Sequence, residues 1–162
     1  MKTDKFYFTF IFILIVCSLQ AQVLTVPEVI KTEFSLMNNH DVEKMSALYM
    51  DSASIISTGI DEIEKGPTGI KNIYSRYFKS SPDLYYEITG IIYNDTAAAV
   101  QYTSKGTMTT LEESVPAYMR GKKYELKNCT IFTIIHGKIA KEITYFDQVS
   151  FLKQAGFFEK HD

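Results

Sequence analysis

The side chains that could do chemistry in this sequence are few, and most stand alone. Three histidines, His40, His136 and His161, lie far apart, and the sequence has no Cys-x-x-Cys or His-x-x-x-His spacing. It also has no glycine-rich phosphate loop and no Gly-x-Ser-x-Gly elbow. Cys129 lies in a strand-like run without a neighbouring histidine, which is typical of a buried, inert thiol. The sequence therefore predicts neither a metal site nor a bound cofactor.

One carboxyl group, that of Asp147, directly follows the strand-like run 138–146. In an apolar cavity a carboxyl group has a raised pKa, so it can carry a proton near neutral pH. Such a group could take a proton from the carbon next to a carbonyl group, or give one to an enolate oxygen. The alternative is structural, because Asp147 also precedes a turn at 148–152, where an N-cap aspartate is favoured. Both interpretations stay open at this point.

Two polar side chains near the end of the chain could assist a carboxyl group. By strand alternation Tyr145 shares the side of Asp147, unless a β-bulge intervenes. Its phenol could stabilise an oxyanion, or it could simply pack in the core. Asn128 interrupts an otherwise alternating run, so it could hold a substrate carbonyl group or bond the backbone.

The elements that must position these side chains begin with helices. Apolar residues recur at helical spacing over residues 28–37, and Asp41 is a predicted N-cap for a second short helix over 42–49. A short strand is expected at 54–57. The turn Gly66-Pro67-Thr68-Gly69 opens a third helix, which extends to Phe78.

After Pro82 the pattern changes to strands. Alternating and β-branched runs predict strands at 84–93, 96–107, 122–135 and 138–146, followed by a closing helical turn over 149–155. Helices followed by a meander of strands indicate an α+β fold, with helices packed on one face of a curved antiparallel sheet.

Length and composition limit the classes of protein. The chain has 162 residues, of which 46% are hydrophobic and 22% are charged, which is typical of one ordinary globular domain. The formal net charge is −2, so the chain lacks the basic surface that nucleic-acid binding requires.

Residues 1–21 are typical of a secretory signal peptide with a cut after Ala21. A short basic start is followed by an uncharged run, 6–17, which is too short to cross a bilayer as a helix. The sequence thus predicts an extracytoplasmic protein, periplasmic or secreted, with a single domain at 22–162 and no membrane span after cleavage. A lipid anchor at Cys17 is the alternative, and the bulky residue before that cysteine argues against it.

Three motifs carry a family resemblance through their order and spacing. They are an opening segment Asn39-His40-Asp41-Val42-Glu43-Lys44-Met45 with Leu48-Tyr49 and Asp51, a Gly66-Pro67-Thr68-Gly69-Ile70 helix start followed by Tyr74 and Phe78, and an ending with Gly137-Lys138-Ile139, Tyr145-Phe146-Asp147, Leu152, Gln154 and Gly156. Over residues 28–156 the chain resembles the SnoaL-like polyketide or ester cyclase group of the nuclear transport factor 2-like superfamily.

The resemblance implies a cone in which three N-terminal helices pack against a strongly curved antiparallel sheet around an apolar pocket. Members that are enzymes use acidic side chains there for proton transfer on small, often polycyclic substrates. Asp147 matches the acid/base of the cyclases. The resemblance also implies a homodimer built on the outer face of the sheet. Fold alone does not fix function, since other members only bind ligands or dimerise.

Within such a cone, two more side chains are candidates for substrate binding. His40 could be a base at the mouth, or an exposed loop histidine. Either Gln101 or Tyr102 should face the pocket, because the two alternate along one strand, and we take Tyr102 as the candidate. Related epoxide hydrolases carry an Arg and a second Asp on the strand that faces their catalytic aspartate. The corresponding stretch of this chain, 101–105, has neither residue, which argues against water activation by paired carboxylates.

Two functions from different classes follow. The first is an exported enzyme, a cofactor-independent cyclase or isomerase that acts on a small apolar molecule with Asp147 as acid/base. The alternative is a non-catalytic module that binds a small ligand, dimerises or binds a partner chain. A cavity that reaches Asp147 would favour the enzyme, whereas a cone filled by Phe and Tyr side chains would favour the module.

Overall fold

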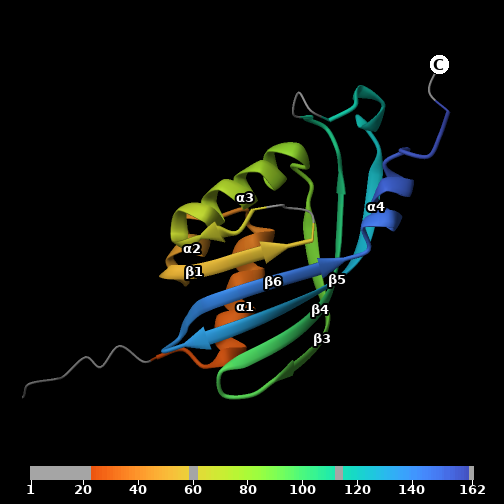
Figure 1. Ribbon diagram of the computed structural model, residues 1–162. Coiled ribbons are helices and arrows are strands. Elements are labelled where there is room, and N and C mark those ends of the chain that lie inside the picture. The colour runs from red at the N-terminus through yellow and green to blue at the C-terminus, as the bar shows by residue number, and fades with distance from the viewer. Residues whose placement is uncertain (1–22, 59–61, 112–114, 161–162) are drawn as a thin grey trace, which may run out of the picture.

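The computed structural model describes residues 23–58, 62–111 and 115–160, and Figure 1 shows the arrangement of its elements. The predicted signal peptide, residues 1–21, and the alternative lipid-anchor site Cys17 lie outside the described residues. The described elements are α1 (Val26–Asn38), α2 (Val42–Ala47), β1 (Tyr49–Ser57), β2 (Glu64–Lys65), α3 (Gly66–Ser80), β3 (Tyr85–Tyr93), β4 (Ala97–Thr107), the 3-10 turn η1 (Ala117–Met119), β5 (Lys123–Ile135), β6 (Lys138–Phe146) and α4 (Gln148–Gln154).

The six strands form one curved, unclosed sheet in the order β2-β1-β6-β5-β4-β3. Three antiparallel pairings join β3 to β6 as a meander, as the sequence predicts. The α+β fold class is therefore confirmed. The sheet is not antiparallel throughout, however, because β1 pairs with β6 in parallel.

The second predicted helix, 42–49, extends too far at its C-terminal end compared with α2. α2 stops at Ala47, and Tyr49 begins β1. The reason is tertiary, because the backbone N–H of Ile139 on β6 donates to the carbonyl oxygen of Leu48 at 2.8 Å. This bond draws the chain into the sheet immediately after the helix, and Tyr49 pairs with Ile139.

Helix α1 lies behind the sheet and crosses β6 and β5 in Figure 1. It starts at Val26, earlier than its apolar spacing predicts, because Thr25 and Glu28 form a capping box. The Thr25 backbone N–H and side-chain hydroxyl group both donate to Glu28 Oε2, at 2.8 and 2.7 Å. The apolar stripe of α1 then packs into the main core.

A β-bulge in β6 decides which side chains of that strand face the helices. Thr133 of β5 pairs with Lys141, but its neighbour Ile134 pairs with Ile139, which leaves Ala140 as an extra residue. Ile139 is buried on the inner side, and the extra residue turns the next inward position to Glu142 instead of Lys141.

The core lies between the sheet and helices α1 to α3. It is built mainly from aliphatic and aromatic side chains of α1, α3 and the inner face of the sheet. A smaller cluster around Met108, Met119 and Ala155 packs beneath α4. Among the described residues no helix is long and apolar enough to be a membrane span.

Candidate functional site

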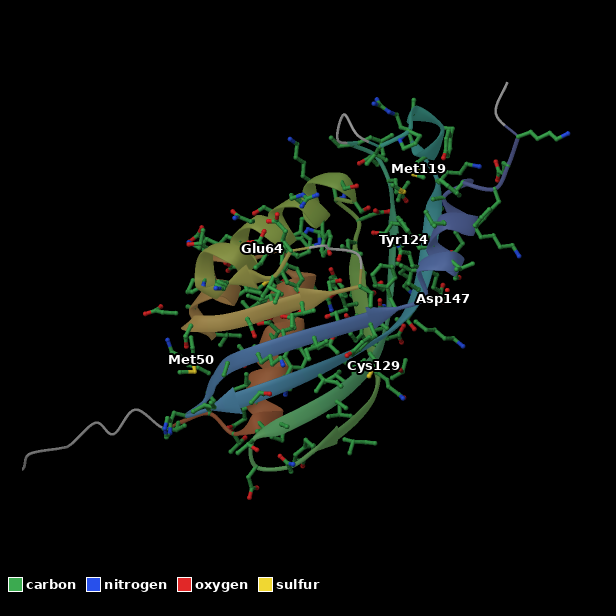
Figure 2. All side chains as sticks on the ribbon, in the orientation of Figure 1. Met50, Glu64, Met119, Tyr124, Cys129 and Asp147 are labelled. Carbon is green, nitrogen blue, oxygen red and sulfur yellow. The ribbon has the colours of Figure 1, made fainter. Side chains whose placement is uncertain are left out.

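Asp147 stands where β6 ends and α4 begins, as Figure 2 shows. Its side chain is exposed, and Oδ1 accepts a hydrogen bond from the backbone N–H of Ser150 at 2.9 Å. This is the helix-cap arrangement that the sequence left open as the structural alternative. Asp147 does not line the cavity described below.

The structure separates two other candidates from any enclosed site. Tyr145 points to the outer face of the sheet. The bulge at Ala140 exchanges the inward and outward positions of the residues that follow it in β6. His40 adopts a left-handed backbone (φ 53°), and its ring stacks on Phe78 with centroids 4.0 Å apart. Its Nε2 atom lies 2.8 Å from the Leu84 carbonyl oxygen, so both the ring face and one nitrogen are used inside the fold.

A cavity of about 370 Å³ lies between the inner face of the sheet, α3 and α4. Its volume is within the range of pockets for small organic ligands. Most of its wall is aliphatic or aromatic. The lining residues are Ile55, Ser57, Ile73, Tyr74, Arg76, Tyr77, Ser80, Ser81, Leu84, Tyr86, Tyr102, Ser104, Met108, Val115, Tyr124, Leu126, Asn128, Glu142, Thr144, Phe146, Gln148, Phe151 and Leu152.

Two of the predicted binding residues, Tyr102 and Asn128, meet in this wall. They pair across β4 and β5, and Tyr102 rather than Gln101 faces inward. The Asn128 amide nitrogen donates to Ser104 Oγ at 3.0 Å and to the Leu126 carbonyl oxygen at 2.9 Å. These bonds hold the amide in place and leave its Oδ1 atom as an acceptor for a ligand donor.

The carboxyl group in the cavity wall is that of Glu142, which is 3% exposed. The Tyr49 hydroxyl group donates to Glu142 Oε2 at 2.5 Å. The hydroxyl groups of Tyr74 and Thr144 donate to Oε1 at 3.1 and 3.3 Å. Burial raises the pKa of Glu142, and these three hydrogen bonds act in the opposite direction by stabilising its charged form.

A chain of hydroxyl groups links this carboxyl group to Tyr102. The Tyr102 hydroxyl lies 3.1 Å from Thr130 Oγ1, which lies 2.8 Å from Thr144 Oγ1. Thr144 in turn donates to Glu142. Tyr102 and Glu142, which are far apart in the sequence, therefore belong to one polar network in an apolar surrounding.

A second carboxyl group lies behind the first. Glu33 of α1 has no exposed surface, and its Oε1 atom lies 2.8 Å from the oxygen of the same Tyr49 hydroxyl group, within hydrogen-bond distance. Its Oε2 atom is buried without a hydrogen-bond partner. Burial and the nearby charge of Glu142 raise the pKa of Glu33 well above its usual range.

Sequence reasoning missed both glutamates, for different reasons. The inward orientation of Glu142 depends on the bulge at Ala140, which no local sequence pattern predicts. Glu33 did leave a signal, since it lies four residues after Val29 and four before Met37, on the apolar stripe of α1. A charged residue within such a stripe indicates a buried ionisable group.

The arrangement is suited to proton transfer. A carboxyl group with a raised pKa borders an apolar space, and hydroxyl groups can stabilise either of its protonation states. Within residues 23–58, 62–111 and 115–160, no three His, Cys, Asp or Glu side chains gather closely enough to hold a metal ion.

Solved structures with similar folds support the fold at low sequence identity. A protein with a ketosteroid isomerase-like fold from Catenulispora acidiphila, in complex with trimethylamine, has a TM-score of 0.67 and 14% identity over 82% of this chain and 95% of its own. The putative polyketide cyclase IdmH from Streptomyces antibioticus has a TM-score of 0.68 and 20% identity, covering 80% and 97%. A SnoaL-like polyketide cyclase from Agrobacterium tumefaciens has a TM-score of 0.66 and 16% identity, covering 82% and 99%.

Family membership comes from the sequence itself. A search of curated proteins gave no match. The family model of the SnoaL-like domain matches residues 31–142, which is more than half of the chain and includes Glu33, Tyr49 and Glu142. The chain therefore belongs to the SnoaL-like domain family.

Proposed function

We propose that this protein is a cofactor-independent acid/base enzyme of the cyclase or isomerase type, which acts on a small apolar carbonyl compound. The observation that carries the proposal is the Glu142 carboxyl group, which is buried, borders the cavity and accepts three hydroxyl donors. The acid/base role thus moves from Asp147 to Glu142, because Asp147 is exposed and caps α4.

The proposed step is enolisation. The ionised Glu142 takes a proton from the carbon next to the substrate carbonyl group, so the C–H bond breaks and its electron pair forms an enolate. The enolate then either takes the proton back from Glu142 at another position, which is isomerisation, or attacks a second carbonyl carbon, which closes a ring. In the second case the C=O π bond opens to an alkoxide, which takes the proton from Glu142 and restores the carboxylate. The apolar wall raises the basicity of the carboxylate and holds the substrate in reach, two effects that supply much of such a rate increase.

One observation favours the non-catalytic alternative. Both oxygens of Glu142 already accept hydrogen bonds from Tyr49, Tyr74 and Thr144. In a ligand-binding protein the same network would serve only to satisfy a buried carboxyl group. The two functions therefore differ in one observable. Only the enzyme catalyses exchange of the proton next to the carbonyl group of a bound ketone with solvent.

Exchange of the acidic C–H hydrogen of a simple ketone with solvent deuterium distinguishes the enzyme from the ligand-binding module. We would incubate 2-tetralone, a compact bicyclic ketone, with the protein in D2O and follow deuterium incorporation by mass spectrometry. An enzyme accelerates the exchange, and Glu142→Gln removes about 10²-fold or more of the acceleration. Glu87→Gln, on the exposed side of β3, is the matched control. Binding of 2-naphthol, an analogue of the enol, without any exchange of 2-tetralone would favour the ligand-binding module.

We further propose that the protein is exported and dimeric. The signal-like residues 1–21 support export, and the mass of the secreted product would reveal whether cleavage follows Ala21. An apolar row across the outer face of the sheet supports a homodimer. It consists of Ile92, Ala99, Ile131 and Ile143, which pair in register across β3, β4, β5 and β6.

A further inference from the structure

The hydroxyl group of Tyr49 contacts two carboxyl groups at once, although it carries a single hydrogen. Its oxygen lies 2.8 Å from Glu33 Oε1 and 2.5 Å from Glu142 Oε2. Both separations are hydrogen-bond distances, and each needs a hydrogen between the two oxygens. Burial and both neighbouring carboxyl groups raise the pKa of Tyr49 well above 10, so the phenol remains protonated. Two bonds and one phenolic hydrogen require a second hydrogen, which must come from a carboxyl group.

The environments of the two carboxyl groups indicate where that hydrogen resides. Glu33 is fully buried, its Oε2 atom has no partner, and Tyr49 is its hydrogen-bond neighbour. Glu142 receives donors from Tyr49, Tyr74 and Thr144. A negative charge costs least where it receives the most donors and most where a buried oxygen is left unpaired.

We propose that Glu33 and Glu142 share one proton through Tyr49, with the proton on Glu33 and the negative charge on Glu142 at neutral pH. Glu33 then donates to the Tyr49 oxygen, and Tyr49 donates to Glu142. Glu33 is a positioning residue, because it does not line the cavity and acts through Tyr49. The protonation pattern is independent of catalysis, whereas its consequence, a Glu142 poised as a base, rests on the proposed function.

One charged side chain, Arg76 of α3, lines the cavity together with Glu142, and a positive charge on that side favours the ionised form of Glu142. The other groups that face the pair are neutral. Tyr74 of α3, Tyr86 of β3 and Tyr102 of β4 face the network, and burial raises the pKa of all three. Thr130 and Thr144 of β5 and β6 contribute neutral hydroxyl groups. On α2, Glu43 and Lys44 form ion pairs at the surface with Lys71 and Asp41.

The direct test is the carboxyl 13C NMR spectrum of the protein labelled with 13C-glutamate, titrated from pH 4 to pH 9 without any ligand. Glu33→Gln and Glu142→Gln assign the two resonances, and Glu87→Gln is the surface control. At pH 7 we expect Glu33 at the chemical shift of a protonated acid and Glu142 at that of a carboxylate. In Glu142→Gln the Glu33 midpoint should move to lower pH, because the neighbouring charge is gone. Two carboxylates at pH 7, or a protonated Glu142 beside an ionised Glu33, would overturn the proposal.

A second measurement uses the unmodified protein alone and therefore does not depend on whether any variant folds. The infrared spectrum of the unmodified protein at pH 7 should contain the C=O band of a protonated carboxylic acid, because ordinary surface carboxyl groups are ionised at that pH. Absence of that band would also overturn the proposal.

The catalytic consequence has its own readout, so the two proposals can fail separately. If 2-tetralone exchange is catalysed, its rate in Glu33→Leu should fall about tenfold below that in Glu33→Gln, because only the amide can still donate to Tyr49. The pH profile of Glu33→Gln should also lack the inflection that comes from ionisation of Glu33. If no exchange is catalysed but the NMR pattern is as expected, the proposed function fails and the shared proton stands. If exchange is catalysed while both glutamates are ionised, the shared proton fails and the proposed function stands.

Discussion

The Tyr49 hydroxyl group donates to Glu142 across the parallel boundary between β1 and β6, at a distance of 2.5 Å. The two residues are 93 positions apart in the sequence. Their contact depends on two local events, the entry of the chain into the sheet at Tyr49 and the bulge at Ala140. A polar centre is thereby built inside an otherwise apolar core, and its stability and its chemistry can be tested together.

Loss of the bridging hydroxyl group should be costly. Tyr49→Phe removes both hydrogen bonds and leaves two buried carboxyl groups facing a ring, so we expect a loss of about 3 kcal/mol in the free energy of unfolding. Tyr74→Phe removes one of three donors to Glu142 and should cost about 1 kcal/mol. Urea denaturation at pH 7 measures both, with the exposed Tyr85→Phe as control. Equal losses for Tyr49→Phe and Tyr74→Phe would contradict the bridging role.

The pH dependence of stability should reveal the buried proton. The pKa of Glu33 is raised in the folded state above its ordinary value of 4.5. Between these two values the folded chain holds a proton that the unfolded chain has released, so stability falls as the pH rises. The slope reaches at most about 1.4 kcal/mol per pH unit for one proton.

Glu33→Gln should flatten this dependence, because the amide does not titrate. We expect the stability of the variant relative to the unmodified protein to increase steadily from pH 5 to pH 8, as measured by urea midpoints. Glu87→Gln should follow the unmodified protein throughout, since its side chain is exposed on β3. A constant difference between Glu33→Gln and the unmodified protein over this range would argue that Glu33 is ionised in the fold.

Asp147 should behave as a helix cap. Asp147→Ala should cost about 1 kcal/mol of stability, whereas Asp147→Asn should be nearly neutral, because asparagine caps helices equally well. Neither change should affect 2-tetralone exchange beyond its effect on the amount of folded protein. Loss of exchange in a folded Asp147→Asn protein, with Glu142→Gln unaffected, would return the acid/base role to Asp147.

Local sequence patterns predicted most of this fold and little of its polar centre. The apolar spacing of α1 and the alternation of β3 to β6 were sufficient, because each element buries one face. Local patterns could not predict the sheet face on which Glu142 lies, because a bulge determines it, or the start of β1, because a long-range backbone hydrogen bond determines it. Of the predicted binding residues, Tyr102 and Asn128 line the cavity, while His40 packs against Phe78. The resemblance directed attention to a motif position, Asp147, rather than to the burial of each carboxyl group.

The outer face of the sheet should mediate dimerisation. Ile92 is 79% exposed and Ile131 is 42% exposed, and both lie in one row across four strands with Ala99 and Ile143. In a two-fold dimer this row meets its own copy, so Ile131→Lys places two like charges in the contact and should shift the protein to monomers. Sedimentation at micromolar concentrations measures the change. Ile63→Lys, at an exposed position before β2, is the matched control and should stay dimeric. If the unmodified protein is already monomeric, or if Ile131→Lys dimerises normally, the interface lies elsewhere or does not form.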